Sequence, residues 1–214
     1  MLFPAFHGGS YEALSPIAMA RRTINFYVEA IESPGAEFQA AMYPTPGWAE
    51  FGSVAQSPVR AVFYQNGRAF AVIGTRFYEV FANGTLTERG TVIQTGTAPA
   101  TITANGEGGT ELFITVDGNG YVYDLATDTL TQIAALNGIA DFGGMLDGFF
   151  VSLDAAASEI RISDLFDGTT WNSLYFAQRD AAPDLWQSML VSGAFIWLFG
   201  EETSETWYNA GRAP

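Results

Sequence analysis

Short runs of consecutive apolar residues recur along the chain at a nearly constant interval. Their central residues lie 42, 37 and 46 positions apart. Each run is too short for an ordinary helix and is typical of a strand buried on both faces. The four runs are FAVIG at 70–74, LFITV at 112–116, FFVSL at 149–153 and FIWLFG at 195–200. We therefore expect a repeated β unit.

Each apolar run follows one strand and precedes at least one more. In three units the leading strand ends in a turn-forming pair: Asn66-Gly67, Asn105-Gly106 or Asp147-Gly148. Such pairs accept the positive φ that two-residue hairpins require. A fourth strand closes the first three units, at 85–93, 129–136 and 169–177. An antiparallel meander of four strands and about forty residues is typical of a β-propeller blade.

These units predict an all-β, propeller-like fold. The four expected blades cover about 59–93, 100–136, 140–177 and 185–211. A β-sandwich could contain the same hairpins, but it would not need a regular four-strand period. The fourth blade has only three strands before the sequence ends. Because an exposed strand edge invites pairing, we expect the N-terminal arm, further downstream chain or a neighbouring subunit to cover it.

The first 57 residues follow a different pattern. They predict an N-terminal arm with two strands, within 22–30 and 37–51, on either side of the turn IESPGA. The second strand runs into the sequence Pro44-Thr45-Pro46-Gly47, which we expect to set a turn in the arm. Proline cannot donate a ladder hydrogen bond, so this is an edge strand or an arm.

The charge is strongly unbalanced. The chain carries 23 acidic and 9 basic residues, a net charge of −14, and every basic residue is an arginine. Nucleic-acid binding draws most of its affinity from Lys and Arg that neutralise phosphates, so the chain should repel DNA. An acidic surface can simply aid solubility. It can also form a wall past which a polyanion slides without sticking.

The sequence offers little catalytic chemistry. His7 is the only histidine and there is no cysteine, which excludes a histidine-rich metal site and thiolate chemistry. We therefore expect neither a cofactor nor a bound metal. Most aspartates stand next to Gly, Asn or Thr, where they form turns. The candidates are Asp117, Asp124, Asp141, Asp147, Asp154, Asp164, Asp167, Asp180 and Asp184.

Two other functional classes stay open at this stage. Exposed aromatic platforms would suit a carbohydrate-binding propeller used for host attachment, although aromatic residues in strands are more often core or interface residues. A propeller glycosidase would need two carboxylates about 5–10 Å apart in a central pocket.

Three stretches in order resemble a known family. They are RTINFYVEAIESPG with AAMYPTPGWAEF, then ISDLFDGTTWNSLYFAQRDAAPD, then LFGEETSETWYNAG. Together they are similar to the tail-hub proteins of short-tailed bacteriophages, the packaged-DNA stabilisation family typified by the P22-like tail accessory factor. The resemblance covers about 25–211. Family members are usually longer, which leaves open a fragment, a naturally short form or a remainder on another polypeptide.

The resemblance implies a structural virion protein without enzymatic activity. It implies a homo-oligomeric ring, with six copies expected, below the portal and adaptor. The ring would extend the DNA channel, help to retain the packaged genome, and carry the tail needle, tailspikes or fibres. DNA would pass through without specific binding, and no membrane is involved. The protein would be made in the host bacterial cytoplasm and end in the virion tail.

The residues singled out by these motifs are structural. Pro183 and Asp184 should end the link into the fourth blade, while Gly200, Glu205, Trp207 and Gly211 belong to its hairpin. Turn chemistry does not explain Glu205. We expect this carboxylate to pair with an arginine or with backbone amides at a strand end.

Overall fold

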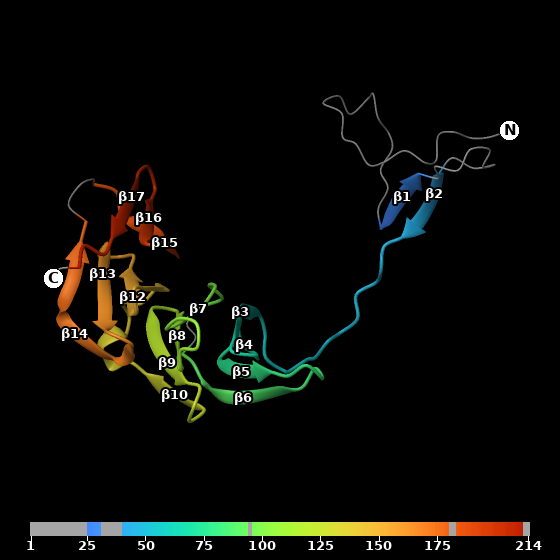
Figure 1. The fold of residues 1–214 in the computed structure, drawn as a ribbon, viewed down its shortest axis with the longest axis horizontal. Coiled ribbons are helices and arrows are strands. Elements are labelled where there is room, and N and C mark those ends of the chain that lie inside the picture. The colour runs from blue at the N-terminus through green and yellow to red at the C-terminus, as the bar shows by residue number, and fades with distance from the viewer. Residues whose placement is uncertain (1–24, 31–39, 94–95, 180–182, 212–214) are drawn as a thin grey trace. The chain divides into compact units, whose positions relative to one another are not determined.

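The computed structural model describes residues 25–30, 40–93, 96–179 and 183–211. The chain divides into two compact units, residues 1–50 and 51–214. In the first unit, strands β1 (Phe26–Ala30) and β2 (Ala40–Pro44) form an antiparallel pair (Figure 1). The amide of Thr45 extends this pair by donating to the carbonyl of Asn25 at 2.9 Å.

Residues 45–54 have no regular secondary structure, and all but one of the side chains are exposed. No turn is formed at Pro44–Gly47, although the sequence predicted one there. Pro44 instead ends β2, and the indole of Trp48 is fully exposed. Pro44 and Pro46 deny the chain two amide donors, which favours an open path over a hydrogen-bonded one.

The second unit consists of four antiparallel sheets that follow one another along the chain (Figure 1). We call them blades 1 to 4. Blade 1 contains β3 (Val59–Gln65), β4 (Arg68–Ile73), β5 (Arg76–Val80) and β6 (Leu86–Thr91). Blade 2 contains β7 (Thr101–Ala104), β8 (Glu111–Val116), β9 (Asn119–Asp124) and β10 (Thr129–Gln132), followed by the short 3-10 helix η1 (Ala134–Leu136).

Blade 3 contains β11 (Phe142–Leu146), β12 (Phe149–Asp154), β13 (Glu159–Asp164) and β14 (Asp167–Gln178). Blade 4 contains β15 (Trp186–Ser192), β16 (Phe195–Gly200) and β17 (Ser204–Tyr208). The predicted propeller-like fold is confirmed, with repeated four-stranded meanders and a fourth blade of three strands. The sheets do not close into a ring in the described chain.

Turn chemistry explains two of the three predicted two-residue hairpins. Asn66-Gly67 and Asp147-Gly148 connect adjoining strands directly, and all four residues have positive φ. The prediction for Asn105-Gly106 is wrong, because β7 and β8 are joined by a longer loop. There the Asn105 side chain accepts a hydrogen bond from the Glu111 amide at 3.1 Å, which stabilises a wider connection.

Apolar clusters fill the space between consecutive blades. Phe70 and Phe77 of blade 1 pack with Tyr123 of blade 2 at ring-centroid distances of 5.5 and 5.0 Å. Similar clusters join blade 2 to blade 3 and blade 3 to blade 4. The outer face of blade 1 is covered in part by Val54, which precedes β3. Each internal blade is therefore held by apolar burial on both faces.

Candidate functional site

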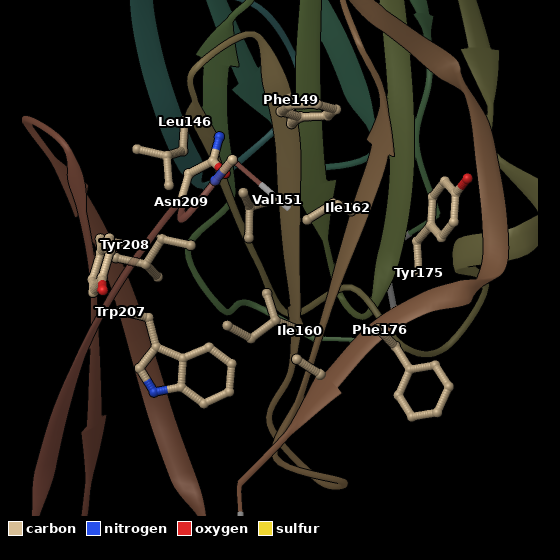
Figure 2. A pocket seen from close by; sticks show the side chains of 13 residues that line it. Leu146, Phe149, Val151, Ile160, Ile162, Tyr175, Phe176, Trp207, Tyr208 and Asn209 are labelled. Carbon is tan, nitrogen blue, oxygen red and sulfur yellow. The ribbon is translucent and has the colours of Figure 1, made fainter. Parts of the chain in front are cut away.

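An apolar groove of about 490 Å³ lies between blade 3 and blade 4. Figure 2 shows Trp207 and Tyr208 of blade 4 on one side of it, Tyr175 and Phe176 of β14 on the other, and Ile160 between them. Its full lining is Leu146, Phe149, Val151, Ile160, Ile162, Tyr175, Phe176, Ala177, Ile196, Trp207, Tyr208, Asn209 and Gly211.

The lining contains no carboxylate and no cation. Its hydrogen-bonding groups are the two tyrosine hydroxyls, the Trp207 indole N–H, backbone groups and the amide of Asn209. The Asn209 side-chain oxygen already accepts the Gly211 amide at 2.9 Å. A cavity of this chemistry takes up apolar side chains and provides no acid–base pair. The groove is therefore suited to packing against another apolar surface.

Trp207 is fixed at one wall of the groove by two interactions. Its ring meets the ring of Trp186 edge-on, with centroids 5.3 Å apart and an interplanar angle of 84°. Its indole N–H donates to Glu205 Oε2 at 3.0 Å. Because Trp186 is fully buried, the wall that Trp207 forms is anchored in the core between blades 3 and 4.

Glu205 belongs to a polar cluster at the end of blade 4. The other carboxylate oxygen, Oε1, lies 2.8 Å from Arg179 Nε. This confirms the expectation that Glu205 pairs with an arginine. The Arg179 side chain is only 2% exposed, so the ion pair is largely shielded from water. Arg179 comes directly after β14, whereas Glu205 lies on β17, and the pair therefore ties blade 3 to blade 4.

Asp184 is the second carboxylate of this cluster. It lies 3.2 Å from Arg179 Nη2 and accepts the backbone amides of Glu202 and Thr203 at 3.0 and 3.1 Å. These amides, together with the Thr203 hydroxyl and the arginine, lower the pKa of Asp184 to about 2. Arg179 also donates to the Asp184 carbonyl and to the Thr203 hydroxyl. The link into blade 4 is thus bound to the β16–β17 turn.

Gly200 is required by the close approach of this cluster. A Cβ atom at this position would lie 2.2 Å from Asp184 Oδ2 and 2.8 Å from Arg179 Nη1. The absence of a side chain therefore lets the ion pair sit directly against β16.

The structure brings together most of the residues singled out in the sequence. Asp184, Gly200, Glu205 and Trp207 share the cluster or its immediate contacts. Pro183 lies one position before Asp184, and Gly211, with φ of +68°, lies at the rim of the groove. Pro44, Thr45, Pro46 and Gly47 lie in the other unit. The structural roles proposed for the motif residues as a set stay predictions.

Sequence reasoning missed Arg179, which is the centre of the cluster. The available signal was composition: the chain has only nine basic residues, and one of them falls within the second motif. A cation in such an acidic chain, immediately before a Pro-Asp link, could have been matched to Glu205.

A second polar cluster joins blade 1 to blade 2. Arg68 and Arg89 both contact the nearly buried carboxylate of Glu79, at 2.7 and 2.5 Å, and both contact Asp128 of blade 2. The hydrogen bond from Arg68 is the main cause of a lowered Glu79 pKa. Burial is the main cause that raises the pKa of neighbouring Tyr123 to about 12. The shielded Glu79 carboxylate fixes the two arginines within blade 1, and the more exposed Asp128 links them to blade 2.

Most of the described candidate aspartates have structural partners. Asp124 accepts the amides of Ala126 and Thr127, and Asp167 accepts Thr169, which is the pattern of turn-forming aspartates. Asp117 pairs with the buried Arg60 at 2.8 Å. Asp180 and His7 lie outside the described residues. Within the described ranges, no three His, Cys, Asp or Glu side chains gather closely enough to hold a metal ion.

No helix in the described part of the chain has the length and apolar character needed to cross a membrane. None of the curated proteins matches the sequence.

Solved structures share the fold at low sequence identity. The mitotic checkpoint complex matches with a TM-score of 0.54 and 11% identity, covering 89% of this chain and 59% of the other. The WD40 domain of Neurospora crassa Pan2 matches with a TM-score of 0.48 and 12% identity, covering 74% of this chain and 48% of that chain. The chain thus spans about half the length of these structures. The match to the mitotic checkpoint complex supports the propeller-like fold and nothing beyond the fold.

The sequence itself gives the stronger finding. Residues 20–214 match the Phage_stabilise family, described as bacteriophage P22 Gp10, beta-propeller. The match covers nearly the whole chain, and its described fold agrees with the repeated blades. The chain therefore belongs to the bacteriophage P22 Gp10 β-propeller family and is by that membership a phage structural protein.

Proposed function

We propose that this chain is a tail hub or nozzle subunit, whose copies assemble into a ring of six below the portal and adaptor. The ring extends the DNA channel, retains the packaged genome and carries other tail parts such as a needle, tailspikes or fibres. Its work is assembly and channel lining.

The exposed outer face of blade 4 is the observation that carries this proposal. Blade 4 exposes apolar side chains on the face turned away from blade 3: Leu190, Phe195, Trp197 and Phe199. The corresponding face of blade 2 or blade 3 is buried by the next blade. A contiguous apolar face of this kind marks a contact surface.

The charge supports a channel that does not hold DNA. With a net charge of −14 and no lysine, the chain lacks the cations that neutralise phosphates. A ring of such subunits lets a polyanion pass without sequence-independent adhesion. The structural partners of the described aspartates also support a role in assembly rather than catalysis.

Electron microscopy of the purified full chain, with sedimentation analysis over a range of concentrations, tests the proposal. We expect a ring of about six copies around an axial channel, and no retention of double-stranded DNA at 150 mM salt. A species that stays monomeric at every concentration, or that binds DNA tightly, would overturn it.

A carbohydrate-binding propeller is the second candidate, and one observation favours it. Trp207, Tyr208 and Tyr175 present aromatic side chains around the groove. Sugar sites combine such platforms with several polar groups, and this lining has few. Tight binding on a glycan array by the isolated protein, lost in Trp207→Ala, would favour this candidate over the ring.

A further inference from the structure

The outer edge of β17 lacks a strand partner in the described chain. In blades 1, 2 and 3, the third strand pairs on its outer side with β6, β10 and β14. In blade 4, β17 pairs only with β16, and Thr206 and Tyr208 are exposed. An uncovered edge presents a row of amide and carbonyl groups that can take up another strand.

The groove lies where the repeat places the side chain of a fourth strand. In blade 2, Leu130 of β10 packs over Gly90 of blade 1. A Cβ atom added at Gly90 would lie only 2.6 Å from Leu130 Cδ2. In blade 3, Trp171 of β14 packs on Phe113 of the preceding blade at 5.3 Å. The equivalent space in blade 4 faces β13 and β14, and it is the groove. An extended strand with a large apolar side chain would therefore fit this space, which the described chain leaves open.

The N-terminal unit supplies strands of this chemistry. The β1–β2 register pairs Phe26 with Pro44 and Val28 with Met42, so apolar residue types stand at paired positions. A two-stranded hairpin is marginally stable by itself in water. It gains stability by adding to an existing sheet, as in other cases of strand addition.

The order of the chain favours a neighbouring copy as the source. The hairpin is tethered to blade 1, at one end of the row of blades, while the free edge belongs to blade 4 at the other end. In head-to-tail association, the blade 1 end of one copy meets the blade 4 end of the next. That arrangement brings the tethered hairpin of one copy to β17 of its neighbour.

We propose that the β1–β2 hairpin of one copy adds to the β17 edge of a neighbouring copy and fills the groove between blades 3 and 4. The inference rests on the proposed ring and names the contact that builds it. The exposed outer face of blade 4 widens the same contact.

Disulfide cross-linking tests this contact cleanly because the chain has no cysteine. Glu29→Cys on β1 and Thr206→Cys on β17 both change exposed residues. When the two full-length single variants are mixed and oxidised, we expect a covalent dimer that neither variant forms alone. Glu107→Cys, exposed in the β7–β8 loop, replaces Thr206→Cys in the control and should give at least tenfold less dimer.

A groove-filling variant provides an independent measurement. Ala177 lines the groove and is exposed, so Ala177→Trp should occupy it and weaken association at least tenfold in sedimentation. Ala126→Trp, in an exposed turn of blade 2, should leave association unchanged.

The outcomes separate this inference from the proposed function. If the ring assembles but the mixed variants form no disulfide between positions 29 and 206, the hairpin contact is wrong and the hub proposal stands. The same conclusion follows if Ala177→Trp leaves the affinity between copies unchanged. A disulfide formed within single copies of the double variant would assign the hairpin to its own chain and also overturn the inference. A chain that never associates would overturn both.

Discussion

Blade 2 and blade 4 carry the same sequence pattern and have different surroundings. In blade 2, every residue from Leu112 to Val116 of β8 is buried, because blades pack on both faces. In blade 4, β16 alternates: Ile196 and Leu198 are buried against blade 3, while Phe195, Trp197 and Phe199 are exposed by 45%, 39% and 38%. The continuous apolar run thus accompanies two packed faces in blade 2, whereas in blade 4 one face of the same kind of run is exposed in the described chain.

The two blades also differ in what holds them. Blade 2 is enclosed by aromatic and aliphatic side chains on both faces. Blade 4 has one apolar face against blade 3, and the Arg179 cluster binds its entry and its outer hairpin. Blade 2 also makes ion pairs with blade 1 through Asp117 and Asp128. The end of the row therefore differs from its middle in having one apolar face packed instead of two.

The largest expected effect separates the two blades directly. Phe113→Ala in β8 removes a fully buried ring and should lower the free energy of unfolding by about 3–5 kcal/mol. Phe199→Ala in β16, at the uncovered face, should cost less than about 1 kcal/mol in the unassociated chain. Urea unfolding followed by tryptophan fluorescence measures both. Equal losses would show that the outer face of blade 4 is already packed.

The next effect concerns the polar cluster of blade 4. Arg179→Met leaves Asp184 and Glu205 without their shared cation, and should lower the free energy of unfolding by about 3 kcal/mol. The control is Arg76→Met, whose pair with Glu88 is exposed and should be worth about 0–1 kcal/mol. If the two variants unfold at the same urea concentration, the cluster does not hold blade 4.

The smallest effect is a pH dependence. The pKa of Asp184 falls from its ordinary 3.8 to about 2 in the fold, so its contribution is present above pH 4 and is lost as the pH falls towards 2. Asp184→Asn should therefore be less stable than the parent chain at pH 5, and the difference should shrink by pH 2. Urea midpoints at pH 5, 4, 3 and 2 measure this.

Asp124→Asn in blade 2 is the matched comparison for that titration. Its carboxylate has a pKa lowered mainly by the Ala126 amide, without an arginine in contact. Its pH-dependent loss should be smaller than that of Asp184→Asn. A larger loss would contradict the expectation that Arg179 adds to the acid sensitivity that the Glu202 and Thr203 amides give Asp184.

Local signals made much of the fold predictable from the sequence. The apolar runs identify the second strand of each blade, and Asn66-Gly67 and Asp147-Gly148 identify hairpins through their backbone preferences. Asn105-Gly106 was misleading, because the side chain of Asn105 caps a more distant amide and opens the turn. A dipeptide preference does not contain that contact.

The candidate site was only partly predictable because its contacts are distant in sequence. The motifs pointed to Asp184, Gly200, Glu205 and Trp207, but they did not identify Arg179 as the cation that joins them. The groove could not be derived either, since it depends on how β14 and β17 lie against each other across blades 3 and 4. The apolar pattern indicates where the strands are, whereas the space between two blades depends on how those strands pack in three dimensions.

Each blade is formed by one uninterrupted stretch of about forty residues. At synthesis rates of about 5–20 residues per second, a ribosome releases one such stretch every few seconds. A blade can therefore form its own hydrogen bonds during translation, and the following blade then buries its exposed face. Contiguous blades therefore allow assembly in the direction of synthesis, with each completed blade offering its face to the next.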